Sequence, residues 1–128
     1  MRVIAGEFRS RKLKTIPGTS VRPTPDRLRE ALFNILAPQI AGKVFIDAYA
    51  GSGSVGIEAL SRGAQHVILF ERNPEAVRVI RENLESLGID GKATLLRGNA
   101  LTLLTKHDAD ILCIDPPYAN VRDYQAAL

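Results

Sequence analysis

The chain has 128 residues, of which 45% are hydrophobic and 24% are charged, a composition typical of one globular domain. No apolar run approaches the roughly 20 residues that a membrane-spanning helix needs, and the N-terminus lacks the apolar segment of a signal peptide. The single cysteine, Cys113, excludes an internal disulfide. We therefore expect a cytoplasmic protein without membrane association.

Charge is unevenly distributed along the chain. Residues 1–30 carry eight basic and three acidic side chains, a net charge of +5, whereas the remainder has a net charge of −2. A basic segment on a slightly acidic body favours a polyanionic partner that is bound through its phosphates. A solvated, charged surface without a partner is the alternative, and charge alone does not separate the two.

The first segment, residues 2–16, alternates imperfectly between apolar and polar residues and predicts a short hairpin with a break near Arg9 and Ser10. The following stretch, PGTSVRPTP, predicts an extended loop because each proline disfavours the α conformation of its predecessor. We expect residues 1–21 to form a basic arm and residues 22–128 to form the main domain.

A helix is predicted to begin with Thr24 as its N-cap, Pro25 in its first turn and Asp26 near the positive end of its dipole. Pro38 is predicted to end it. An apolar stripe at helical spacing is formed by Leu28, Ala31, Leu32 and Ile35.

Strand-like runs alternate with helical segments over the rest of the chain. Strands are predicted at VFID, HVILFE, ATLLR and DILCI. A helix from about Val55 to Arg62 follows the first strand, and a second helix follows Asn73-Pro74 and ends at Gly88. A short helix is predicted in GNALTLL. The buried stripe of the second helix is predicted to comprise Val77, Ile80, Leu84 and Leu87. This alternation indicates an α/β fold with a mostly parallel sheet and helices on both faces.

Polar residues collect where these strands end, at Asp47, Glu71, Asn99 and Asp115. In an open α/β sheet, ligands bind beyond the carboxyl ends of the strands, so these residues are expected to face one cleft. The first strand leads into VFIDAYAGSGSVG, a glycine-rich turn before a helix, which is typical of a site that cradles a nucleotide-like ligand.

The ligand of this turn is predicted from two details. The letters GSGSVG fit the dinucleotide fingerprint, with Glu71 twenty residues after Gly51 to bind ribose hydroxyls, so NAD is one candidate. Asp47 would repel a pyrophosphate but would attract the ammonium of S-adenosylmethionine (SAM), which we favour. Alternatively, Asp47 braces the loop or caps a helix, and Glu71 is a surface acid paired with Arg72.

The second detail is the DPPY motif, which an enzyme that transfers a hydride would not need. Acceptors around an exocyclic amino group, here the Asp115 carboxylate and the Pro116 carbonyl, would orient its lone pair toward a methyl donor. Pro117 would stiffen the loop, and Tyr118 would stack on a base removed from its neighbours. The alternative is a plain Pro-Pro turn. Neither histidine belongs to a cluster with metal-ligand spacing, so we expect no metal.

The sequence resembles the RsmD family of bacterial 16S ribosomal RNA guanine-N2 methyltransferases. The resemblance is carried by MRVIAGEFRSRKLK, RPTPDRLREALFNIL, DAYAGSGSVGIEALSRGA, FERNP and DPPY, over nearly the whole chain. It implies a Rossmann-like class I methyltransferase that uses SAM to methylate the 2-amino group of a guanine in 16S ribosomal RNA, within an assembling 30S particle. We expect a monomer.

The resemblance also implies roles for individual residues, with Asp115 to Tyr118 holding the target base. The cofactor-binding residues would be Asp47, Tyr49, Ala50, Gly51, Ser52, Gly53, Glu71, Arg72, Asn99 and Ala100. The RNA-binding residues would be Arg9, Arg11, Lys12 and Arg22.

Two features depart from the family pattern. Tyr49 stands where the family usually has Phe or another apolar residue, and the chain ends ten residues after Tyr118. The family continues through a further helix and strands five to seven, so we expect those C-terminal strands to be missing. Two alternatives to RNA guanine methylation are a non-catalytic RNA- or SAM-binding fragment and an N-methyltransferase of another exocyclic amine, such as adenine in DNA or RNA. A third is an NAD-dependent oxidoreductase.

Overall fold

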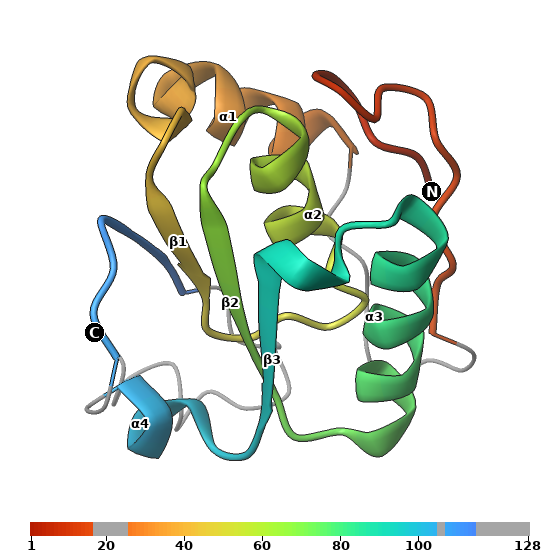
Figure 1. The fold of residues 1–128 in the computed structure, drawn as a ribbon, viewed down its shortest axis with the longest axis vertical. Helices are drawn as coiled ribbons and strands as arrows, with labels where there is room; N and C mark the ends of the chain where they lie inside the picture. Colours follow the sequence, from red (N-terminus) through yellow and green to blue (C-terminus); the bar gives the residue numbers. More distant parts are fainter. Residues whose placement is uncertain (17–25, 105–106, 115–128) are drawn as a thin grey trace.

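The computed structural model describes residues 1–16, 26–104 and 107–114 (Figure 1). Their centre is one parallel sheet in the order β3-β2-β1-β4. Its strands are β1 (Val44–Asp47), β2 (His66–Glu71), β3 (Ala93–Arg97) and β4 (Ile111–Cys113). The predicted α/β class with a parallel sheet is therefore confirmed.

Helical segments connect the strands. α1 (Asp26–Ile40) precedes β1, and α2 (Ser54–Ser61) joins β1 to β2. α3 (Pro74–Leu87) and the 3₁₀ turn η1 (Asp90–Lys92) join β2 to β3, and α4 (Ala100–Leu103) leads toward β4. The chain thus runs outward from β1 to β3 and then returns to the opposite side of β1. The sheet order reverses between β1 and β4, which is the topological switch point where such sheets bind ligands.

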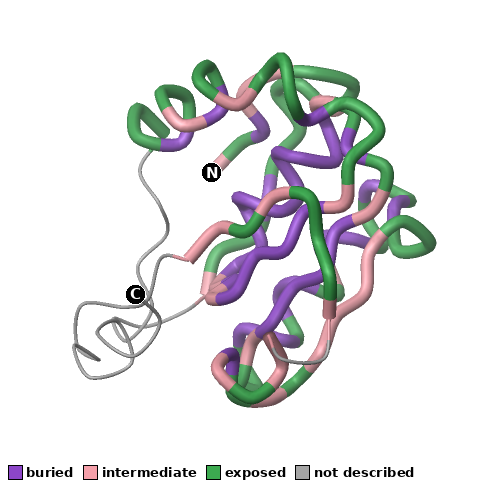
Figure 2. The backbone as a smooth tube through the Cα atoms, turned by 90° about the vertical axis from the view of Figure 1, so that its left-hand side faces the viewer, coloured by how far each residue is buried: buried purple, intermediate pink, exposed green. Residues whose placement is uncertain are grey.

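The two faces of the sheet are buried in separate hydrophobic clusters, because successive strand residues point to opposite faces. Phe45, Val67 and Leu69 pack with residues of α1, α2, α3 and the N-terminal segment. Ile46 and Phe70 face the other way and pack with residues of α4. The buried stretches run through the middle of the molecule in Figure 2. The sheet is therefore covered on both faces, as predicted.

Several predicted boundaries are confirmed. β2 and β3 coincide with HVILFE and ATLLR. The Asn73 side chain accepts hydrogen bonds from the backbone N–H groups of Glu75 and Ala76 and so caps α3. Gly88 ends α3 in the left-handed conformation, with φ of 69°. The residues predicted to form the stripe of α3 are all buried.

The predictions for α1 were wrong in two respects. Leu28 and Ile35 of the apolar stripe are 57% and 76% exposed, and α1 instead buries Arg29, Phe33 and Ile40. This face of α1 is the buried one because Phe33 stacks on Phe45, with ring centroids 6.2 Å apart, and because the Arg29 guanidinium donates to the backbone carbonyl of Arg2. Pro38 lies inside the last turn, where its missing N–H removes one hydrogen bond without ending the helix. The predicted cap at Thr24 and Pro25 falls outside the described residues.

The N-terminal segment, residues 1–16, is hairpin-like, as predicted, but makes little sheet. One antiparallel bridge pairs Arg2 with Lys12, and turns occupy most of the residues between them. Val3 and Leu13 are buried in the core cluster of α1, α2 and α3. The segment therefore packs against the body, and in Figure 1 it runs from beside the start of α1 down the side of α3. Among the described residues, no helix is both long and apolar enough to cross a bilayer.

Candidate functional site

The glycine-rich loop begins where β1 ends and turns directly into α2. Gly51 and Gly53 have φ of 57° and 85°, left-handed values that residues with side chains rarely adopt. The Gly53 N–H donates to the carbonyl of Ala50 at 2.8 Å, which closes the turn. The Ala50 N–H donates to the carbonyl of Phe70, so the loop is also fastened to β2. α2 then begins at Ser54, and its N-terminus lies at the carboxyl edge of the sheet.

Glu71, the last residue of β2, joins that strand to the glycine-rich loop. One carboxylate oxygen accepts a hydrogen bond from the Gly51 N–H at 2.8 Å. The other accepts from the backbone N–H groups of Arg72 at 3.0 Å and Asn73 at 2.9 Å. A carboxylate has about four lone-pair directions, so capacity for one further donor remains beside the loop. Glu71 is thus an acceptor at the loop, and it accepts from the backbone N–H of Arg72.

Asp47 lies at the switch point itself. It is the last residue of β1, is 2% exposed, and stands in register with Leu69 of β2 and Cys113 of β4. Burying a carboxylate costs free energy unless it is paired or hydrogen-bonded, so Asp47 is a candidate for a specific polar role at this edge. Tyr49 is half-buried and packs against the cluster on the α4 face of the sheet.

Asn99 and Ala100 lie where β3 leads into α4. The Asn99 side chain accepts from the Leu101 N–H at 2.8 Å and so caps α4, while Ala100 is buried against the α4-face cluster. Between them and β2, the Gly98 N–H donates to the carbonyl of Glu71 at 3.2 Å. The carboxyl ends of β1, β2 and β3 are therefore linked by hydrogen bonds, and the predicted cofactor residues gather at this edge.

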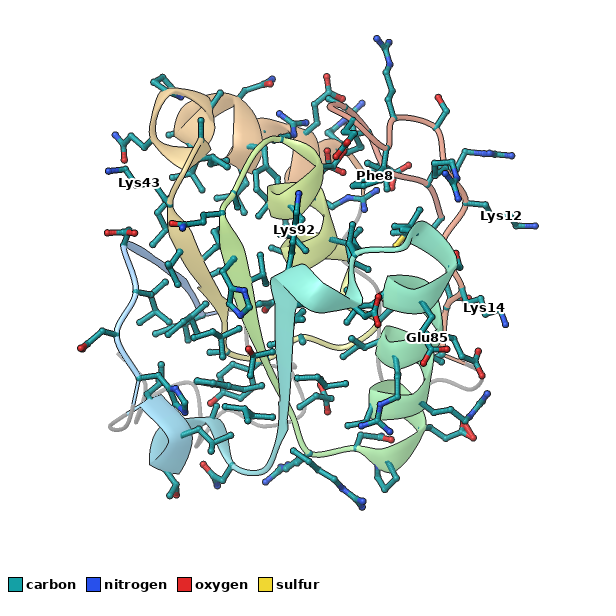
Figure 3. The ribbon with its side chains drawn as sticks, in the orientation of Figure 1. Phe8, Lys12, Lys14, Lys43, Glu85 and Lys92 are labelled. Carbon is teal, nitrogen blue, oxygen red and sulfur yellow. The ribbon has the colours of Figure 1, made fainter. Side chains whose placement is uncertain are left out.

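The remaining predicted site residues are not part of that group. Asp115 to Tyr118 and Arg22 lie outside the described residues, so their places stay predictions. Arg9, Arg11 and Lys12 are exposed on the N-terminal segment. The Arg11 guanidinium donates to the carbonyl of Ser86 at the end of α3. The three basic residues thus form a separate group beside α3, and Figure 3 shows Lys12 projecting away from the body there.

A cavity of about 380 Å³ lies between residues 12–15 of the N-terminal segment and the side chains of Arg78, Val79 and Glu82 on α3. Lys14 forms an ion pair with Glu82 across it at 3.0 Å, and Arg78 pairs with Glu82 and Glu75. The hydrogen bond from Lys14 is the main cause that lowers the pKa of Glu82 below its ordinary value. The hydrogen bond to Glu75 is the main cause that raises the pKa of Arg78. Alternating charges therefore fasten the segment to α3.

Several buried polar residues were missed by the sequence reasoning, Arg29, Glu58 and Asn83 among them. Arg29 and Glu58 have fully buried side chains, and Asn83 is 1% exposed. Each lies at helical spacing from a buried apolar residue: Arg29 four before Phe33, Glu58 three after Val55, and Asn83 three after Ile80. A polar residue on the apolar face of a helix is the signal that could have found them.

Comparison with known proteins identifies the family. The family model described as conserved hypothetical protein 95 matches residues 1–128. The chain is 39% identical over 120 residues to ribosomal RNA small subunit methyltransferase D of Escherichia coli and 37% identical over 123 residues to that of Haemophilus influenzae. It belongs to the RsmD family.

Solved structures agree with this membership. The chain superposes on the Escherichia coli protein yhhF with a TM-score of 0.82 at 38% identity, covering 92% of this chain and 64% of that one. For the Thermus thermophilus protein TTHA0928 the TM-score is 0.79 at 32% identity, with 99% and 78% covered. The Rossmann-like fold that the RsmD resemblance implied is therefore confirmed.

The chain is shorter than its RsmD relatives. The alignments cover 92% of this chain but 60% of the Escherichia coli protein and 64% of the Haemophilus influenzae protein. Within the described residues, no group of three or more His, Cys, Asp or Glu side chains could hold a metal ion.

Proposed function

We propose that this chain carries the cofactor site of an RNA methyltransferase that uses SAM to methylate the exocyclic 2-amino group of a guanine in 16S ribosomal RNA. The observation that supports this best is the hydrogen bond from the Gly51 N–H to Glu71, beside the buried Asp47. Membership of the RsmD family supports the RNA substrate, since two relatives are named ribosomal RNA small subunit methyltransferase D.

The donor groups at the carboxyl edge fit SAM. Glu71 has acceptor capacity left beside the loop, which suits the ribose hydroxyls of an adenosine. Asp47 supplies a buried negative charge at the switch point, which suits the ammonium of the methionine part and opposes a pyrophosphate. Tyr49 to Gly53 would border the methionine end. Arg72, Asn99 and Ala100 would border the adenine, with Asn99 exposed at the tip of α4.

The chemistry proposed for this site is one methyl transfer. Bound SAM supplies a methyl group on a positively charged sulfur. The amine nitrogen would accept that methyl group as the carbon–sulfur bond breaks and leaves its electron pair on sulfur, and the nitrogen would lose one proton to solvent. The chain's part is to orient the amine, for which Asp115 and the Pro116 carbonyl offer acceptors, while Pro117 fixes the loop and Tyr118 stacks on the base.

The N-terminal segment would contribute RNA affinity. Arg9, Arg11 and Lys12 are exposed, close together in sequence and separate from the cofactor residues, so they are available to phosphates. Arg22 would extend this group toward the target base. In this arrangement the 30S particle or its RNA binds across the N-terminal segment and the carboxyl edge.

The experiment is transfer of tritiated methyl groups from SAM to unmodified 16S ribosomal RNA and to 30S particles, with the same chain carrying Asp115→Ala as the matched control. We expect label in RNA with the unaltered chain and at least a hundredfold less with the variant. Equal labelling by both chains would contradict the roles given to DPPY.

Calorimetric titration with S-adenosylhomocysteine and with NAD shows which of the two cofactors the chain binds, and binding of NAD alone would overturn the proposal. Binding of S-adenosylhomocysteine without transfer would identify a non-catalytic cofactor-binding fragment.

A further inference from the structure

Asn83 of α3 contacts two parts of the molecule that have separate proposed roles. Its side-chain Oδ1 accepts from the Lys14 N–H at 2.8 Å. Its Nδ2 donates to the Lys14 carbonyl at 3.1 Å and to the Ser52 carbonyl at 3.2 Å. One amide thus joins the backbone of the N-terminal segment to the backbone of the glycine-rich loop.

This arrangement uses both hydrogens of the Asn83 amide. An amide has two N–H donors, and here they point at two carbonyl oxygens while its own oxygen meets an N–H. The reversed orientation would place the amide oxygen against both carbonyl oxygens, so these contacts establish which terminal atom of Asn83 is oxygen and which is nitrogen. Asn83 is 1% exposed, so water has little access to replace a contact that is lost.

The contact with Ser52 controls the loop because a peptide group is planar. Holding the Ser52 carbonyl toward Asn83 turns the N–H of the same peptide, that of Gly53, to the opposite side, where it donates to Ala50. α3 supports the loop a second time one turn earlier, since a Cβ on Gly53 would lie 3.2 Å from the Ile80 side chain. The conformation of the loop therefore depends on Asn83.

The contact with Lys14 controls the N-terminal segment in the same way. It holds both backbone groups of Lys14, close to Lys12 and Arg11, which we propose to bind RNA. If the N-terminal segment is displaced, the hydrogen bonds between Lys14 and the Asn83 amide break or distort, and that amide also holds the Ser52 carbonyl. If the loop is displaced, the bonds between Asn83 and Lys14 are affected in turn, because energetic coupling between two sites is reciprocal.

We infer that Asn83 is a positioning residue that couples RNA binding at the N-terminal segment to SAM binding at the glycine-rich loop. This inference rests on the proposed function. RNA that docks on the segment in this geometry stabilises the loop conformation in which SAM binds, and bound SAM in turn tightens RNA binding.

The experiment measures the coupling directly. The dissociation constant of S-adenosylhomocysteine is determined by equilibrium dialysis with and without a saturating unmodified 16S ribosomal RNA transcript. We expect RNA to tighten the binding by about 5- to 100-fold in the unaltered chain. Asn83→Ala should reduce that factor to within twofold of one, with each chain first checked for folding by circular dichroism.

Two pairs of variants separate coupling from stability. Ser61 is also buried and also binds the segment, because its hydroxyl accepts from the Phe8 N–H and donates to the Ala5 carbonyl, and neither of these bonds involves the glycine-rich loop. Ser61→Ala should therefore keep the coupling factor. Lys14→Pro removes the N–H that Asn83 accepts and should lower the factor even if Asn83→Ala does not fold. Lys14→Ala loses only the side chain and should keep it.

The outcomes are distinguishable from those of the proposed function. Binding of both ligands with a factor near one in the unaltered chain would overturn the inference alone. So would a normal factor in both Asn83→Ala and Lys14→Pro. Failure of the chain to bind S-adenosylhomocysteine or the RNA would overturn the proposed function and, with it, the inference.

Discussion

Arg29 of α1 and Glu58 of α2 form an ion pair in which both side chains are fully buried, with Nη1 and Oε1 3.8 Å apart. Glu58 uses its two oxygens to accept from the backbone N–H groups of Ile4 and Ala5 at 2.9 and 3.0 Å. Arg29 donates to the carbonyl of Arg2, and Arg62 donates to Glu58. This buried cluster fastens the start of the chain to the helices that cover the sheet.

Glu58→Gln should destabilise the protein strongly. The substitution removes the negative charge that Arg29 and Arg62 share and directs an amide NH₂ at a backbone N–H. Removing one partner of a buried pair costs about 3–5 kcal/mol, because the other charge stays buried. Urea unfolding followed by circular dichroism measures this. Glu85→Gln, on the exposed face of α3, should change the free energy of unfolding by less than about 0.5 kcal/mol. Equal effects of the two substitutions would show that the cluster does not hold the segment.

Glu71→Ala should weaken binding of S-adenosylhomocysteine by about 10- to 100-fold, as expected when a hydrogen bond to a charged group worth roughly 1.5–3 kcal/mol is lost. The structure adds that Glu71 also holds the Gly51 N–H, so the loop would lose an anchor at the same time. Glu71→Gln keeps one acceptor oxygen and should weaken binding less than Glu71→Ala. Calorimetric titration gives both values, and an unchanged affinity in Glu71→Ala would remove Glu71 from the cofactor site.

The sheet could be predicted from the sequence because the residues that mark each strand are neighbours in the chain. The runs HVILFE and ATLLR are apolar and rich in β-forming residues, and Asn73-Pro74 carries its own capping chemistry, so β2, β3 and the start of α3 could be predicted. The proposed cofactor residues could be placed together at one edge because all strands of a parallel sheet end on the same side.

The orientation of α1 could not be predicted because it depends on distant partners. Two faces of α1 carry apolar residues at helical spacing, one with Leu28 and Ile35 and the other with Phe33 and Ile40. The choice between them is made by Phe45 and Glu58, which are remote in sequence. Asn83 was missed for the same reason, since its acceptors are 69 and 31 residues away.

Gly56→Ala should destabilise the protein by about 1–3 kcal/mol, the range for overpacking a core. A Cβ at this position of α2 would lie 2.7 Å from the Leu69 side chain and 2.9 Å from that of Val67. Gly56 therefore permits close packing of α2 on β2. Gly91→Ala is the matched control, because a Cβ at Gly91 meets nothing within 4 Å. Thermal unfolding compares the two, and a neutral Gly56→Ala would mean that α2 shifts at little cost.

Replacing Arg9, Arg11 and Lys12 together by alanine should weaken binding of 16S ribosomal RNA. The dissociation constant of S-adenosylhomocysteine measured without RNA should stay unchanged. Each phosphate contact contributes about 0.7–0.9 to the slope of log K against log salt, so the slope should fall by about 2–3. Fluorescence anisotropy at several salt concentrations measures it. A Lys43→Ala, Lys92→Ala double variant removes charges near the amino ends of β1 and β3, away from the segment, and should keep the slope (Figure 3). A comparable loss in both variants would favour a diffuse charged surface.

Glu82→Gln should make stability less sensitive to acid. The hydrogen bond from Lys14 is the main cause that lowers the pKa of Glu82 from its ordinary value of 4.5, and Arg78 adds to it. A carboxylate with a lowered folded-state pKa stabilises the protein above its unfolded pKa, and that contribution is lost as pH falls through the folded value. The unaltered chain should therefore lose stability below about pH 4.5 more steeply than Glu82→Gln. The difference should be small, because both Lys14 and Glu82 are reached by solvent. Urea midpoints between pH 6 and pH 3 give the two slopes.

Lys14→Ala should flatten the dependence of stability on pH in the same way, because it removes the partner that lowers the pKa of Glu82. The double variant, Lys14→Ala with Glu82→Gln, should show no further change. Additive effects would mean that Glu82 is stabilised mainly by Arg78 within α3, and not by the N-terminal segment that crosses it.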